Sequence, residues 1–363
     1  MLITDPEQLK EYTSEKRNWQ GIPGIEVTAK GRMFAVFYSG GITEDVGNYS
    51  LLVKSDDRGK TWSEPIAVAY AGAESRAYDP CIWIDPQERL WFFYAVMPNH
   101  RQIGVCCNAP DADILDWGAE QVIGHDVMLN KPIVLKDGRW LLPIAIWRDG
   151  VKVKFETAHT PKLSFVYESR DNGKTFTRLG GADVPNRSYD EHMLLERRDG
   201  SLLMFVRLVK GIGKSKSFDG GMTWTVGENT GLGGPNSRFF LGRLQSGNVI
   251  LINHAVSDAR SYLTAFLSED DGETFPMSLL LDDRPDISYP DLKQTADGLI
   301  YVIYDRERGA VYQKMRIPSE EMAKEILFCT FREEDIRAGK LITPDAKMRQ
   351  VISRLQKPAK KSQ

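Results

Sequence analysis

Four eight-residue stretches of this chain share the pattern S-x-D-x-G-x-T-[WF], and this repetition restricts the fold more than any other feature. They are SDDRGKTW (55–62), SRDNGKTF (169–176), SFDGGMTW (217–224) and SEDDGETF (268–275). The last three begin about 50 residues apart, and the first gap is about twice as long, so one unit there lacks the stretch. A period near 50 residues is typical of a four-stranded propeller blade and not of a helical solenoid repeat.

The sequence between these boxes consists of short apolar runs such as RMFAVFYSG, RLWFFYAV and SLLMFVRL. Many follow tight-turn signals such as KDGR and RDGS, a pattern that predicts β-hairpins. Helix-like patterns occur near the end, in EEMAKEIL (320–327) and DAKMRQVISRLQ (345–356). We therefore predict an all-β, six-bladed β-propeller of four-stranded antiparallel blades with a short C-terminal helix. It forms one domain over 1–363, with blades over about 19–340 and a tail at 341–363.

The repeated aspartate has a structural and a functional interpretation. Asp and Gly at this spacing favour a turn with a left-handed glycine, in which the carboxylate accepts backbone N–H groups. A repeated calcium site would need a run of oxygen ligands and a terminal glutamate, which the boxes lack. The boxes are therefore predicted to hold hairpin corners and not to carry the chemistry.

Charge and cysteine content narrow the class of protein. The chain has 47 Lys and Arg against 50 Asp and Glu, so its net charge of −3 predicts neither a nucleic-acid nor a membrane-surface partner. The four cysteines include no C-x-x-C pair, which favours free thiols over a metal site. The first residues, MLITDPEQLKEY, do not have the pattern of a signal peptide, so we expect a cytoplasmic protein. The oligomeric state stays open.

Boxes of this pattern at blade spacing resemble the Asp-boxes of the sialidase superfamily, and the resemblance extends over about residues 19–336. It implies a six-bladed propeller with the boxes on its periphery. It also implies a site where three arginines bind a sugar carboxylate and a glutamate activates a nucleophilic tyrosine. A loop carboxylate would act as general acid and base, and no metal or organic cofactor would be needed.

Four residues match these roles by motif and spacing. Glu191 in YDEHMLLERRDG resembles the glutamate partner, and Arg207 follows sixteen residues later, as the second clamp arginine. Arg260 lies eight residues before the fourth box and resembles the third clamp arginine. Tyr289, after that box, resembles the nucleophile. Equivalent positions on successive blades meet around the axis of a propeller, so we expect these side chains to lie together.

The loop SGGITEDVGNYS supplies the candidate acid and base. Its carboxylates are Glu44 and Asp45; we favour Glu44, with Asp45 as the alternative. Further polar residues beside apolar strands are either substrate contacts or turn residues: Asp79 in RAYDPCIWID, Asn130, Lys131 and His192.

One position departs from the family pattern. The arginine of the first clamp motif is Gly21 in NWQGIPGIEV, and losing a buried charged contact costs ~2–5 kcal/mol. Candidate replacements are Arg17, Arg76 and Arg238, and Gln20 is a neutral alternative.

Three functions are therefore considered. The first is a sialidase-like retaining exo-glycosidase acting on a terminal sialic acid or related acidic sugar. The second is a hydrolase or lyase for another glycan, such as a uronic-acid or deoxysugar oligosaccharide. The third is a carbohydrate-binding propeller without catalysis.

Overall fold

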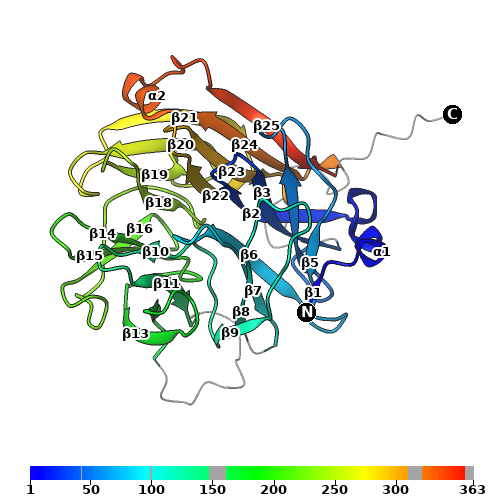
Figure 1. Cartoon of the computed structure of the whole chain (residues 1–363). Helices are drawn as coiled ribbons and strands as arrows, with labels where there is room; N and C mark the ends of the chain where they lie inside the picture. Colours follow the sequence, from blue (N-terminus) through cyan, green and yellow to red (C-terminus); the bar gives the residue numbers. More distant parts are fainter. Residues whose placement is uncertain (42, 99, 147–160, 310–320, 356–363) are drawn as a thin grey trace.

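Six antiparallel sheets follow one another around the molecule in chain order (Figure 1). The computed structural model describes all residues except 42, 99, 147–160, 310–320 and 356–363. The first strand of most blades contacts the first strand of a neighbouring blade, which places these strands around the axis. The arrangement confirms the predicted six-bladed propeller.

The strands of the first three blades are as follows. Blade 1 contains β2 (Trp19–Val27), β3 (Met33–Gly40), β4 (Tyr49–Ser55) and β5 (Ala67–Ala69), and β1 (Leu2–Ile3) adds to its outer edge. Blade 2 contains β6 (Ala77–Ile84), β7 (Leu90–Val96), β8 (Arg101–Cys107) and β9 (Gln121–Gly124). Blade 3 contains β10 (Ile133–Val134), β11 (Trp140–Ala145), β12 (Ser164–Ser169) and β13 (Thr177–Ala182).

The remaining blades repeat this order. Blade 4 contains β14 (Met193–Glu196), β15 (Leu202–Arg207), β16 (Ile212–Ser217) and β17 (Glu228–Asn229). Blade 5 contains β18 (Phe240–Arg243), β19 (Val249–His254), β20 (Ser261–Ser268) and β21 (Met277–Pro285). Blade 6 contains β22 (Ile287–Gln294), β23 (Ile300–Arg306), β24 (Glu325–Phe331) and β25 (Lys347–Arg354). Short helices are α1 (Pro6–Leu9), η1 (Lys10–Tyr12), η2 (Ser14–Lys16) and α2 (Glu333–Ala338).

The predicted short C-terminal helix is present, but it does not lie in either of the two segments expected for it. Residue 320 of the first segment lies outside the described residues, and the last three, Glu325–Leu327, begin β24. Most of the second segment belongs to β25, which pairs with β24 in the outer half of blade 6. All of β24 is buried, so pairing within the blade outweighs local helix preference. The blades therefore extend to Arg354, beyond the expected boundary near residue 340. Among the described residues of this region, α2 is the α-helix, and its C-cap is Gly339 with φ 64°.

Each box connects the third and fourth strands of its blade. In the first box, the Asp57 carboxylate accepts hydrogen bonds from the Ser55 hydroxyl (2.8 Å), the Thr61 N–H (2.9 Å) and the Thr61 hydroxyl (2.7 Å). Gly59, with φ 82°, donates its N–H to the Ser55 hydroxyl at 2.8 Å. The other three boxes repeat these contacts. The boxes thus close their own loops, as the sequence predicts.

The box carboxylates make the stability depend on pH. Hydrogen bonds, those from Thr61 foremost, lower the pKa of Asp57 to about 2. Because the unfolded pKa is ~3.9, this stabilisation is complete above pH ~4 and is lost as the pH falls toward 2. We expect Asp57→Ala to lower the urea midpoint at pH 6, and to cost about half as much free energy at pH 3. A difference independent of pH would contradict this, and Asp113→Ala, on the surface, controls for the loss of a carboxylate.

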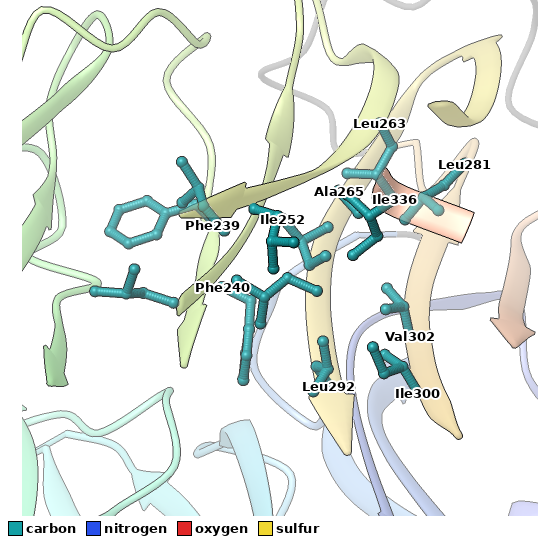
Figure 2. Packing of buried hydrophobic residues seen from close by; sticks show 14 of the residues in the cluster. Phe239, Phe240, Ile252, Leu263, Ala265, Leu281, Leu292, Ile300, Val302 and Ile336 are labelled. Atoms are coloured by element: carbon teal, nitrogen blue, oxygen red, sulfur yellow. The ribbon is translucent and has the colours of Figure 1, made fainter. Parts of the chain in front are cut away.

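Apolar side chains fill the spaces between blades. Figure 2 shows Ile252, Leu263 and Ala265 of blade 5 near Leu292, Ile300 and Val302 of blade 6, with Ile336 of α2 against the same cluster. The box aromatics join these layers: the Trp62 ring lies 6.1 Å from Phe328 of blade 6. This packing fixes the blades against one another, so the loops at the axis have a rigid base.

Candidate active site

Three of the axial strands carry the same irregularity. Their register shifts near Gly21 in β2, near Tyr78 in β6 and near Ser288 in β22. Each shift contains a residue with left-handed backbone directly before a proline: Ile22 (φ 57°), Asp79 (φ 50°) and Tyr289 (φ 56°). Such a conformation costs ~1–3 kcal/mol and persists only where its surroundings hold it. Because a bulge redirects side chains, these bulges aim Asp79 and Tyr289 away from an ordinary strand direction.

Tyr289 meets Glu191 and Arg207, which come from another blade. The Tyr289 hydroxyl donates to Glu191 Oε1 at 3.0 Å and accepts from Arg207 Nη1 at 3.2 Å. Arg207 Nη1 also pairs with Glu191 Oε1 at 2.6 Å. All three residues are buried. The structure therefore brings together three residues that the sequence assigns to chemistry.

The surroundings keep the Tyr289 phenol neutral. Burial, followed by the negative charge of Glu191, raises the pKa of Tyr289 above its ordinary value, against the opposing effect of nearby arginines. At neutral pH the phenol can act as a nucleophile only if a base removes its proton. Glu191 Oε1 is at hydrogen-bond distance for that transfer.

A tight turn aims Glu191. The two residues before it, Tyr189 (φ 56°) and Asp190 (φ 41°), both have left-handed backbone. Arg187 Nε pairs with Asp190 Oδ1 at 2.8 Å, and His192 Nδ1 lies 2.8 Å from the Asp190 carbonyl oxygen. The other ring nitrogen of His192 also faces a backbone carbonyl, so both are engaged by the fold. His192, expected as a substrate contact, thus supports the turn, and burial lowers its pKa to about 4.

Arg207 and Arg260 converge on Asn236. Arg207 Nη2 and Arg260 Nη2 both donate to the Asn236 carbonyl, at 3.2 and 2.8 Å. Arg207 Nε donates to the Asn236 side chain at 2.6 Å. The Arg260 guanidinium carbon is 5.5 Å from the Tyr289 ring centroid. Sequence reasoning missed Asn236, whose only signal is its position in GGPNSRFF at the start of blade 5.

Sequence reasoning also missed Arg308, which lies two residues past the end of β23. Its guanidinium carbon is 4.4 Å from the centroid of the Tyr289 ring, and the side chain is buried. Asp305 Oδ2 lies 3.6 Å from Arg308 Nη1, and Glu44 Oε1 lies 3.6 Å from Arg308 Nη2. A signal was present in the sequence: the run DRER (305–308) spans the end of the second strand of blade 6, as Arg207 ends the second strand of blade 4.

The two loop carboxylates differ in their contacts. Glu44 is mostly buried and faces Arg308 at 3.6 Å. Asp45 Oδ1 accepts the N–H of the exposed residue Val46 at 2.7 Å. Glu44 therefore lies beside an arginine of the Tyr289 group, and the choice between the two carboxylates as acid and base stays a prediction.

Asp79 is a buried acid beside this group. Burial, followed by the charges of Glu44 and Glu191, raises the pKa of Asp79 to about 7. Arg76 opposes this rise and stacks on Tyr78, with 4.5 Å between its guanidinium carbon and the ring centroid. Near neutral pH the Asp79 carboxyl can therefore donate as well as accept a hydrogen bond.

Other expected substrate contacts are engaged in holding the fold. Gln20 donates to the Lys324 carbonyl at 2.6 Å and accepts from Ser353 Oγ at 3.0 Å, and Arg17 donates to the same Ser353 oxygen at 3.2 Å. These contacts tie blade 1 to blade 6. Both side chains are therefore held by the framework, and their expected role in place of the missing clamp arginine stays a prediction.

Arg238, Lys131 and Asn130 also contact the framework. Arg238 donates to three backbone carbonyls, those of Pro23, Leu129 and Tyr289. Lys131 pairs with Glu26 at 2.9 Å and Asp291 at 3.1 Å, and Asn130 donates to the His192 carbonyl at 2.9 Å. Arg238 thus supports the backbone of Tyr289, and Lys131 joins the axial strands, while their expected contact with a substrate stays a prediction.

Neither a metal-binding cluster nor a membrane-spanning helix is found among the described residues. No group of three or more His, Cys, Asp and Glu side chains in this part of the chain is arranged to hold a metal ion. None of its helices combines the length and apolar character that a membrane span requires.

The number of blades, their strand order and the placement of Tyr289 opposite Glu191 define a six-bladed propeller with the fold of the sialidases. A family model for the BNR repeat-like domain matches residues 31–302, most of the chain. The protein therefore belongs to the BNR repeat-like family. A search of curated proteins found no match.

Several solved structures share this fold. The Hadza microbial sialidase Hz136 is 18% identical with a TM-score of 0.63, over 79% of this chain and 63% of that one, so this chain spans less than two thirds of its length. The leech intramolecular trans-sialidase is 14% identical with a TM-score of 0.70, over 90% of this chain and 70% of that one. The intramolecular trans-sialidase of Ruminococcus gnavus is 13% identical with a TM-score of 0.68, over 92% and 98%. At these identities the likeness shows the fold alone.

Proposed function

We propose that this protein is a sialidase-like retaining exo-glycosidase that hydrolyses a terminal sialic acid or a related acidic sugar. The observation that carries the proposal is the hydrogen bond of 3.0 Å from Tyr289 to Glu191, with Arg207 in contact with both. A buried tyrosine beside a buried carboxylate supplies a nucleophile and its base.

The charge around Tyr289 favours an anionic substrate. Arg260 and Arg308 lie at its ring, and Arg207 at its hydroxyl. Burial, together with the like charges of Arg308 and Arg207, lowers the pKa of Arg260. A bound carboxylate would relieve this repulsion, and guanidinium groups match it with paired hydrogen bonds.

The reaction would proceed in two steps. Tyr289 Oη attacks the anomeric carbon while Glu191 Oε1 accepts the phenol proton, and the bond to the leaving oxygen breaks as Glu44 or Asp45 protonates that oxygen. The same loop carboxylate then takes a proton from water, and the hydroxide attacks the anomeric carbon. The Tyr289–sugar bond breaks, the phenol recovers its proton from Glu191, and two inversions leave the configuration unchanged.

Asp79 fits a role in binding the sugar. Because its pKa is about 7, it exchanges hydrogen bonds with a ring hydroxyl in either direction near neutral pH. Arg238 and His192 act behind the site, by holding the backbone of Tyr289 and of Asp190.

Incubation with a fluorogenic α-sialoside tests the proposal. We expect release of the fluorophore, and NMR of the first product should show the sugar with retained configuration. An anhydro sugar as the product would instead indicate an intramolecular transfer.

A panel of aryl uronides and deoxysugar glycosides is the control. Turnover of one of these without turnover of the sialoside would favour a hydrolase or lyase for another glycan. Glycan binding without any product would favour a carbohydrate-binding propeller.

A further inference from the structure

The Arg308 side chain fills the space that a side chain at position 21 would need. A Cβ atom at position 21 would lie 2.6 Å from Arg308 Cγ, closer still to Cδ, and 3.0 Å from Asp305 Oδ2. Real Cβ atoms do not approach other atoms so closely, so any side chain at 21 would displace that of Arg308. The glycine is thus explained by the arginine that passes over it, and not by its backbone angles.

Asp305 helps to hold the Arg308 side chain in a fixed position. Asp305 is fully buried, and besides facing Arg308 it accepts the Ile22 N–H at 2.8 Å and the Ser288 hydroxyl at 2.6 Å. Ile22 and Ser288 both adjoin bulges, those of β2 and β22. Asp305 therefore ties the Arg308 side chain to the two strands that present position 21 and Tyr289.

From this geometry we infer that Arg308 is a substrate-binding residue that takes the place of a cation at position 21, contacting the carboxylate of an acidic sugar. This inference rests on the proposed function. Arg308, Arg207 and Arg260 then surround Tyr289 from blades 6, 4 and 5. Glu44 faces Arg308, and the sugar carboxylate would compete with it for the guanidinium.

The substrate pair for the test is an aryl α-sialoside and its C1 methyl ester, which differ in the negative charge that Arg308 would bind. For Arg308→Ala, we expect kcat/KM to fall about 10²–10³-fold on the acid and less than about 10-fold on the ester. Arg306→Ala is the matched control, because its side chain pairs with Glu307 and Glu325. It should change kcat/KM less than about threefold. Equal losses on acid and ester for Arg308→Ala would overturn the inference.

Exchange of the two residues gives a second test. Gly21→Arg alone should lower activity, because two side chains then compete for one volume. In Gly21→Arg/Arg308→Ala, the arginine at 21 should raise kcat/KM on the acid at least about tenfold above that of Arg308→Ala. Thermal unfolding of each variant identifies those that do not fold, and Arg308→Lys, which keeps the charge, should retain more activity on the acid than Arg308→Ala.

Failure of the proposed function is distinguishable from failure of this inference. If the wild type does not hydrolyse sialosides, calorimetry with free N-acetylneuraminate still tests Arg308. Weaker binding by Arg308→Ala than by the wild type would support the inference. Equal affinities, or no binding by the wild type, would overturn it.

Discussion

Tyr289→Phe is expected to lower kcat on an aryl α-sialoside by about 10³-fold or more, because the change removes the attacking oxygen. The phenylalanine ring can keep its place between Arg260 and Arg308. The Glu191–Arg207 ion pair of 2.6 Å also remains, so no buried charge loses its partner. We therefore expect KM and the thermal midpoint to change little.

Burst kinetics provide the second measurement for Tyr289. If a covalent intermediate forms and its hydrolysis is slow, the wild type releases a burst of fluorophore, and Tyr289→Phe should show none. Tyr301→Phe, a buried tyrosine of β23 outside the site, is the matched control. Turnover that survives Tyr289→Phe unchanged would contradict the assignment of the nucleophile.

The fold was predictable because the boxes report it directly. Each box needs only its own eight residues to form, as the contacts of Asp57 with Ser55 and Thr61 show. Because each box depends only on nearby residues, it can be recognised in the sequence, and the spacing between boxes gives the length of a blade. Blade 6 carries no box, and there the expected C-terminal helix was misplaced, since one candidate segment runs into β24 and the other covers β25. Short apolar segments such as EILFCTF do not reveal whether they lie in a sheet.

The site was predictable where a residue keeps its place in the blade. Glu191, Arg207, Arg260 and Tyr289 come from blades 4, 5 and 6, and the structure brings them together. The sequence did not reveal Arg308, because its contact with position 21 joins residues far apart in the chain and depends on two blades meeting at the axis. A glycine in place of an arginine shows that space is available at that position, but it does not show which distant residue fills the space.

For Arg238 and Lys131, the sequence did not distinguish a structural role from a binding role. The sequence offers Arg238 and Lys131 as candidate binding residues, because a charged side chain beside an apolar strand can contact either a substrate or the framework. In the structure their charges meet backbone carbonyls or buried carboxylates. Charge type alone does not separate these roles, since the direction of the side chain depends on the whole ring of blades.

Glu191→Gln is expected to lower kcat about 10²–10⁴-fold, the usual contribution of a positioned general base. Glutamine fills the same space and still accepts the Tyr289 hydroxyl hydrogen bond, but it does not take the proton. It also leaves the buried Arg207 without its carboxylate at 2.6 Å, so we expect a lower thermal midpoint as well. The control is Glu196→Gln, at the end of β14, where the carboxylate accepts the Lys136 N–H at 2.9 Å. Because the glutamate acts only through the tyrosine, Tyr289→Phe/Glu191→Gln should be no slower than Tyr289→Phe alone. Additive losses in the double variant would show that Glu191 acts on the substrate directly, and that Tyr289 has another base.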